Sequence, residues 1–140
     1  MIGFVRKNLL YVAWTVALLS MLGSLYFSEV LKYPPCVLCW YQRIFMYPLV
    51  PIIAVAIIKK TSDLRWYILP LSIAGALIAV YHNLLYYKLL PESIKPCVQG
   101  ISCTTKFIEW YGFVTIPFLS FVAFLAISLS VFFYINSKKT

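Results

Sequence analysis

The chain has 140 residues, of which 63% are hydrophobic and 11% are charged, whereas soluble domains carry roughly 25% charged residues. This composition excludes an ordinary soluble domain, and a chain of this length can hold four membrane spans of about 20 residues each with short loops. The formal net charge of +8 does not indicate nucleic-acid binding, because long apolar segments separate the basic residues.

Charged residues bracket four apolar stretches, which predicts an all-α integral membrane protein built as a four-transmembrane-helix bundle. We expect one membrane domain over residues 1–140, with spans at approximately 9–27, 40–58, 66–87 and 110–135 and with loops 28–39 and 88–109 on one side. The first stretch is longer than the apolar core of a signal peptide, roughly 7 to 15 residues, and lacks a small-residue cleavage site. We therefore interpret it as a permanent helix.

Proline and small residues add detail to these spans. Membrane helices tolerate proline when neighbours satisfy the freed carbonyls, and we expect a kink near Pro48 and Pro51. Small residues recur at helical spacing in the first span, at Ala13, Ala17 and Ser24 among others. They predict close helix approach.

The distribution of lysine and arginine predicts the orientation. An even number of spans places both termini on one side, where seven basic residues gather: Arg6, Lys7, Lys59, Lys60, Arg65, Lys138 and Lys139. The other side holds four: Lys32, Lys88, Lys95 and Lys106. Because cytoplasmic loops carry the excess of basic residues, we expect cytoplasmic termini in a multi-pass protein of the plasma (inner) membrane. The basic bias needs no partner beyond this topology signal and anionic membrane lipid.

All four cysteines fall in the two loops predicted to face outward. Cys36 and Cys39 end the first loop, and Cys97 and Cys103 lie in the second. Disulfides persist in oxidising compartments, so outward pairs indicate oxidised cysteines. Pairing within each loop is the expected resting state, and bridges between the loops stay open as an alternative. A structural bridge over such short loops stabilises by only about 2 kcal/mol, which a helix bundle in lipid hardly needs.

The segment PPCVLCWYQR at residues 34–43 combines these cysteines with an arginine. Pro35 suits the first position of a helix, which places Cys36 and Cys39 in its first turn. The positive end of a helix and the C-x-x-C spacing both favour the thiolate needed for disulfide exchange. Arg43 follows on the same face, roughly 10 Å below the helix start at 1.5 Å per residue. An arginine at the bilayer centre costs at least about 2.5 kcal/mol, so Arg43 is a functional candidate, with snorkelling to the surface as the alternative.

Two further polar residues are candidates for binding a ligand that carries carbonyl groups. His82 lies toward the outer end of the third span and either donates to such a ligand or bonds a neighbouring side chain, and Gln42 is the polar neighbour of Arg43. The aromatic residues Tyr41, Phe45 and Tyr47 are interpreted as packing or lipid contacts in preference to a ring-binding site.

At these residues the chain closely resembles the DsbB-type family of disulfide bond formation proteins. The matching elements are PCVLCWYQR from Pro35, YHNLL from Tyr81, the second cysteine pair of the outer loop, and GFVTIP from Gly112. The small size resembles the short Gram-positive form of the family, disulfide formation protein C (BdbC-like). The resemblance implies a quinone-dependent protein-disulfide oxidoreductase, with menaquinone or ubiquinone as cofactor and without a metal. It also implies a partner outside the cytoplasm, a thioredoxin-fold thiol oxidase that is DsbA-like or BdbD-like.

Carried over by position, the family scheme makes all four cysteines catalytic. It implies that the partner's thiolate attacks Cys97, that the released Cys103 attacks Cys36, and that Cys39 is the thiolate that reduces the quinone. Arg43 would orient the quinone and stabilise negative charge on its oxygen. The chain departs from the longer family members at one point, because only five residues separate its two loop cysteines. Less loop is therefore available to travel between the partner and the first pair.

Three alternatives belong to other classes of protein. A membrane metal-binding protein would use the four thiolates, but zinc sites usually repeat short C-x-x-C knuckles and the second pair here is C-x5-C. An enzyme similar to vitamin K epoxide reductase would carry its redox C-x-x-C after the loop cysteines, opposite to the order here. The third alternative is a non-enzymatic membrane protein with structural disulfides.

Overall fold

Five α-helices and one short π-helix form the described part of the chain. In chain order they are α1 (Ile2–Leu25), η1 (Tyr26–Val30), α2 (Val37–Met46), α3 (Leu49–Lys59), α4 (Arg65–Tyr86) and α5 (Ile116–Lys139). The computed structural model describes residues 2–32, 37–61, 63–91 and 115–139. Within these ranges there is no strand, which confirms the all-α class.

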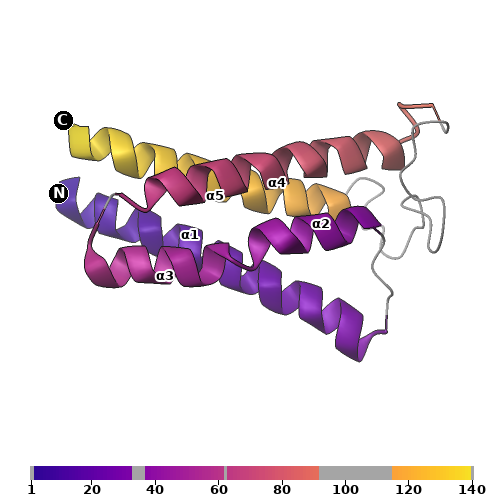
Figure 1. Ribbon diagram of the computed structural model, residues 1–140, viewed down its shortest axis with the longest axis horizontal. Helices are drawn as coiled ribbons and strands as arrows, with labels where there is room; N and C mark the ends of the chain where they lie inside the picture. Colours follow the sequence, from indigo (N-terminus) through magenta and orange to yellow (C-terminus); the bar gives the residue numbers. More distant parts are fainter. Residues whose placement is uncertain (1, 33–36, 62, 92–114, 140) are drawn as a thin grey trace.

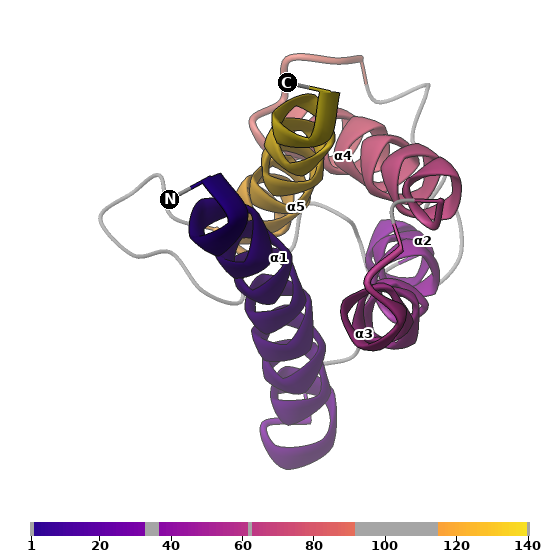
Figure 2. The ribbon, with the colours of Figure 1, turned by 90° about the vertical axis from the view of Figure 1, so that its left-hand side faces the viewer.

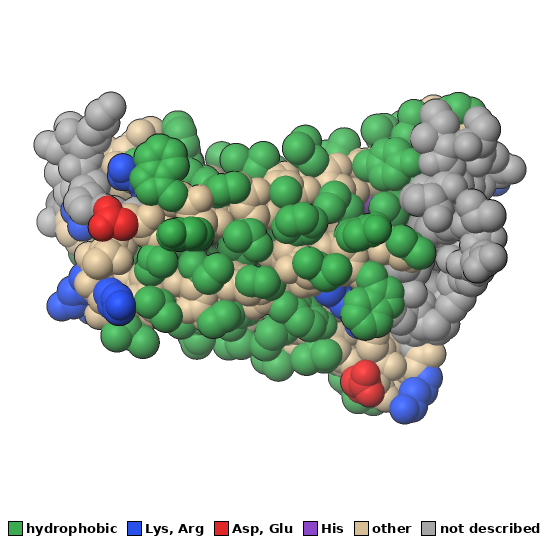
Figure 3. All heavy atoms as spheres, in the orientation of Figure 1, with side chains coloured by type: hydrophobic (Ala, Val, Ile, Leu, Met, Phe, Trp, Pro, Cys, Tyr) green, Lys and Arg blue, Asp and Glu red, His purple; other side chains and the backbone are tan. Residues whose placement is uncertain are grey.

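Four stretches of the described chain are long and apolar enough to cross a membrane: Gly3–Val30, Val37–Lys59, Arg65–Tyr86 and Ile116–Ser137. They confirm the predicted four-transmembrane-helix bundle, and both termini lie at the same end of it (Figure 1). Hydrophobic side chains cover the middle of the molecule's visible face, and charged side chains gather near its ends (Figure 3). This distribution suits a bilayer with an apolar centre. The side of the membrane on which the termini lie stays a prediction.

Packing is densest where α5 meets its neighbours. α5 packs against α1 and α4, α2 packs against α4, and α3 packs against α1. Phe124 and Ile127 of α5 are fully buried, as are Ala13 and Ala17 of α1. The small residues of α1 therefore allow close helix approach as predicted. Viewed from the end, α1 crosses the other helices obliquely, and its far end with η1 lies apart from α4 and α5 (Figures 1 and 2).

The second span is broken between α2 and α3. Pro48 precedes the first residue of α3, and the Tyr47 N–H donates to the Arg43 carbonyl at 2.9 Å to close the last turn of α2. The predicted kink is confirmed at Pro48. At Pro51 the helix continues, because this residue lies in the first turn of α3, where an N–H group has no carbonyl partner within the helix.

The helices extend beyond some of the predicted span limits. The first span was expected at 9–27, whereas α1 begins at Ile2 and η1 ends at Val30. The helix includes Arg6 and Lys7 on the N-terminal side of the apolar stretch, because a helix does not have to begin where the apolar region begins. The first residues of the predicted fourth span, 110–114, lie outside the described ranges.

Candidate functional site

The first two turns of α2 carry three of the predicted site residues. Cys39 lies near the start of the helix, and Gln42 and Arg43 follow it by three and four residues. With about 3.6 residues per turn, Gln42 and Arg43 project to either side of Cys39, one turn deeper in the membrane-crossing segment. The other predicted cysteines, 36, 97 and 103, lie outside the described residues, so the disulfide pairing stays a prediction.

Arg43 connects α2 to the first membrane-crossing segment. Its Nη2 atom donates to the Ser24 carbonyl of α1 at 3.0 Å and to the Ser28 hydroxyl of η1. Its guanidinium carbon lies 5.7 Å from the centre of the Trp40 ring. The half-buried side chain is thus bonded to the first membrane-crossing segment. A guanidinium has five N–H donors, and both of these bonds use the same terminal nitrogen.

Ser24 and Ser28 were not predicted as site residues. Ser28 belongs to η1, and π-helical turns are rare and frequently occur at functional sites. The spacing of four residues between the two serines places them on one helix face. This spacing, opposite an arginine in the next span, is the sequence signal that identifies them.

Gln42 and His82 form a polar pair between α2 and α4. Gln42 Nε2 lies 3.2 Å from His82 Nδ1, and the two side chains are 5% and 2% exposed. With the amide nitrogen as donor, Nδ1 is the acceptor of this hydrogen bond. The predicted neighbour contact of His82 is therefore present, and it brings together two residues that are 40 positions apart.

Cys39 packs against the C-terminal part of α4. It joins a small apolar cluster in which Leu38 and Leu85 are buried and Ile78 and Tyr81 are partly buried. The cysteine itself is half-buried. The start of α2 is therefore held on α4 by apolar contact, with the Gln42 and His82 pair one turn below it.

The aromatic residues of this segment occupy packing and outward positions. Tyr41 is 49% exposed, and Phe45 and Tyr47 pack against the main hydrophobic core. These positions agree with the predicted lipid and packing contacts.

Asn83 is a further polar residue that sequence reasoning did not single out. Its Nδ2 donates to the Ala79 carbonyl at 2.8 Å and to the Pro117 carbonyl of α5 at 3.0 Å. It therefore fixes the first turn of α5 to α4, one residue from His82. The sequence signal for it is its place inside the YHNLL match.

Comparisons of the sequence with known proteins identify its relatives. The family described as "Disulfide bond formation protein DsbB" matches residues 6–134. The chain is 51% identical over 122 residues to "Disulfide bond formation protein C" of Bacillus subtilis (strain 168), which covers 87% of this chain and 88% of the relative. It is 43% identical over 133 residues to "Probable disulfide formation protein C 1" of Bacillus anthracis, which covers 95% of this chain and 96% of that relative. No solved structure gives a significant match.

The chain is a multi-pass membrane protein with the polar site of α2 and α4 inside its membrane-crossing part. It belongs to the DsbB family of disulfide bond formation proteins.

Proposed function

We propose that this protein is a membrane thiol-disulfide oxidase that reoxidises an extracytoplasmic thioredoxin-fold thiol oxidase and passes the electrons to a membrane quinone. The observation that carries the proposal is the position of Cys39 above two fixed polar groups, the Arg43 guanidinium and the Gln42 and His82 pair. Polar and charged groups inside a membrane are costly and are typical of functional sites. Membership of the disulfide formation family supports the thiol chemistry.

The proposed electron path begins at the second cysteine pair. The partner's thiolate attacks Cys97, Cys103 leaves as a thiolate, and the partner's second thiol resolves the mixed disulfide. Cys103 then attacks Cys36, which releases Cys39, and Cys97 attacks Cys103 to re-form the second pair and release Cys36. Two electrons and two protons have then moved from the partner to Cys36 and Cys39. Each step exchanges one disulfide for another, and its rate depends on thiolate fraction and access.

The donors around Cys39 suit a quinone. Quinone oxygens only accept hydrogen bonds, and arginine only donates them. Arg43 would hold one carbonyl oxygen, and the contact with Gln42 would fix the orientation of the His82 ring beside the site. When bound, the quinone supplies a lipid-soluble acceptor for two electrons and two protons.

The redox potentials support a quinone as acceptor. A thioredoxin-fold oxidant with a reduction potential of about −120 mV is regenerated only by an acceptor that is more oxidising or is continuously removed. A membrane quinone, menaquinone or ubiquinone, meets this requirement because the respiratory chain keeps reoxidising it.

Trapping of the partner tests the proposed path. A partner variant that keeps only its attacking cysteine should stay attached to Cys97 as a mixed disulfide and release Cys103, because it lacks the second thiol that resolves this bond. Cys97→Ser is the matched control and should trap no adduct. Adducts that form equally well on Cys36 in the Cys97→Ser variant would show that the partner bypasses the second loop.

A further inference from the structure

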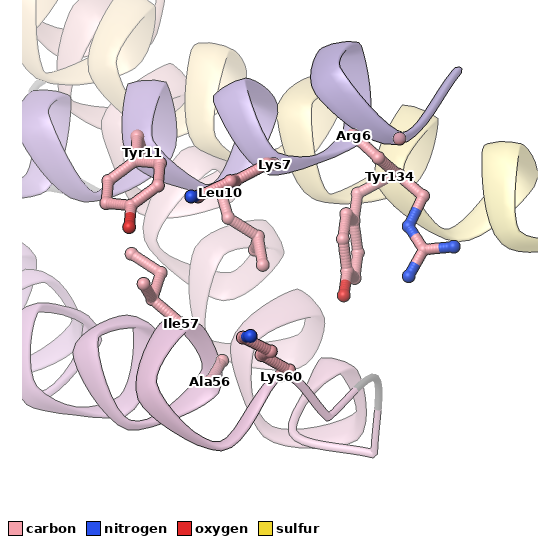
Figure 4. Close-up of a pocket in the computed structure, with 9 residues that line it drawn as sticks. Arg6, Lys7, Leu10, Tyr11, Ala56, Ile57, Lys60 and Tyr134 are labelled. Carbon is pink, nitrogen blue, oxygen red and sulfur yellow. The ribbon is translucent and has the colours of Figure 1, made fainter. Parts of the chain in front are cut away.

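A pocket of about 420 Å³ opens between α1, α3 and α5. Its lining residues belong to the start of α1, the end of α3 and the last part of α5, and these helix ends lie where both termini are, opposite the start of α2 (Figure 1). Figure 4 shows its lining, with Leu10 and Tyr134 directed from α1 and α5 toward α3. A Cβ atom built on Gly3, which also lines the pocket, would meet no atom within 4 Å, so the space next to Gly3 is open. The site of Cys39 takes no part in this pocket.

The lining carries three positive charges and no acidic residue. Arg6 lies 5.3 Å above the Tyr134 ring, and Lys7 lies 5.9 Å from the Tyr11 ring. Lys60, which follows the last residue of α3, faces them from the other side. Aromatic rings attract and orient cations but do not neutralise them. The pocket is therefore an electropositive site suited to an anion.

The polarity of the lining changes with depth along both helices. On α1, Arg6 and Lys7 are followed one turn deeper by Leu10. On α3, Lys60 stands at the helix end and Ile57 lies one turn deeper. Charges at the membrane edge and aliphatic side chains toward its centre repeat the order of groups in a phospholipid, in which a charged phosphate precedes apolar chains.

We propose that this pocket binds an anionic phospholipid, with the lipid phosphate among Arg6, Lys7 and Lys60 and the upper acyl chain against Leu10 and Ile57. Basic pockets between transmembrane helices are typical sites for anionic headgroups. Free phosphate shares the anionic chemistry, but it gains nothing from the aliphatic part of the lining. With the predicted orientation of the bundle, the lipid belongs to the cytoplasmic leaflet.

Lipid retention by the purified full chain tests the proposal. The protein is reconstituted in nanodiscs of phosphatidylcholine with a fraction of phosphatidylglycerol. The protein is then released from the nanodiscs, and the lipids that stay bound to it are identified by native mass spectrometry. Wild type should retain phosphatidylglycerol selectively. Arg6→Gln and Lys60→Gln should each weaken retention about tenfold, which corresponds to about 1.4 kcal/mol. Lys59→Gln is the matched control, since it removes the same charge from an exposed neighbour outside the lining and should leave retention unchanged.

Three outcomes would overturn the proposal. If the wild-type protein did not retain phosphatidylglycerol selectively, the pocket would hold no such lipid. Equal losses in Lys59→Gln and in the two pocket variants would assign retention to diffuse surface charge. Displacement of the lipid by millimolar inorganic phosphate would assign the site to a free anion. Circular dichroism checks that each variant is folded, and Arg6→Lys, which keeps the charge, should retain more lipid than Arg6→Gln.

Discussion

Arg43 either binds the quinone or only holds α2 against the first membrane-crossing segment. These two interpretations predict different results. It is bonded to Ser24 and Ser28, so its guanidinium is fixed beside the face of α2 that carries Cys39. Fixed donors in a membrane suit the recognition of a carbonyl oxygen. They also stabilise the contact between α2 and α1, and the two roles have to be separated by experiment.

Arg43→Met should weaken the apparent quinone affinity by roughly tenfold or more. A hydrogen bond from a charged group contributes about 1.5 to 3 kcal/mol, and 1.4 kcal/mol corresponds to a factor of ten. Arg43→Lys should recover only part of the loss, because an ammonium group lacks the planar fork of arginine. The measurement is steady-state turnover against quinone concentration.

Ser28→Ala is the control for the structural role of this arginine. It removes one acceptor of Arg43 but keeps the guanidinium, so the quinone dependence should change much less than in Arg43→Met. If Arg43→Met turned over with the quinone dependence of wild type, Arg43 would have no place in the quinone site.

At the scale of single helices, the contact between α4 and α5 depends on a glycine. A Cβ atom added to Gly75 would fall on the ring of Phe124, which is fully buried in the core. Two serines, Ser72 and Ser128, join the same helices by a hydrogen bond of 3.0 Å. Close packing and interhelical hydrogen bonds replace the hydrophobic effect as the force that holds helices together in lipid.

Gly75→Ala should therefore destabilise the bundle, although alanine is the better helix former. Overpacking of a core costs typically about 1 to 3 kcal/mol, and the expected result is a lower midpoint of thermal unfolding in detergent. Gly23→Ala is the matched control, because no atom lies within 4 Å of an added Cβ there and the midpoint should stay the same or rise. Equal midpoints for wild type and Gly75→Ala would show that the α4 and α5 contact is looser than the structure indicates.

Sequence alone predicted the helices better than their contacts. The spans and the break at Pro48 follow from hydropathy and from the missing N–H of proline, which are local properties. The π-helical turn of η1 was not predicted, because nothing in the composition of YFSEV separates it from an α-helix. Gln42 and His82 were both candidates, but their pairing depends on the register of α2 against α4 and could only be seen in the structure.

At the scale of the whole molecule, the bundle separates two polar regions. The start of α2 and the C-terminal end of α4 carry the cysteine site, and the end with both termini carries most of the basic residues. The positive charge of that end predicts that it faces the cytoplasm. All four cysteines then face the oxidising side of the membrane, as a path from an extracytoplasmic partner requires.

Thiol labelling of intact cells tests this orientation. After mild reduction, a membrane-impermeant thiol reagent should label the cysteines of the two outer loops without lysis. Cysteines introduced at Ser137, near the end of α5, should be labelled only after lysis and serve as the internal control. The reverse pattern would place the termini outside and would contradict the orientation and the electron path together.

The central claim is that electrons from thiols leave this chain through a quinone. It is tested most directly by mixing the purified protein, without oxygen, with a reduced thioredoxin-fold partner and a membrane quinone and following quinone absorbance together with a thiol count. We predict that one quinone is reduced for each disulfide formed in the partner, and that Cys39→Ser abolishes the quinone signal while the partner still exchanges with the second cysteine pair. Loss of partner thiols without quinone reduction, or quinone reduction that persists in Cys39→Ser, would contradict the account.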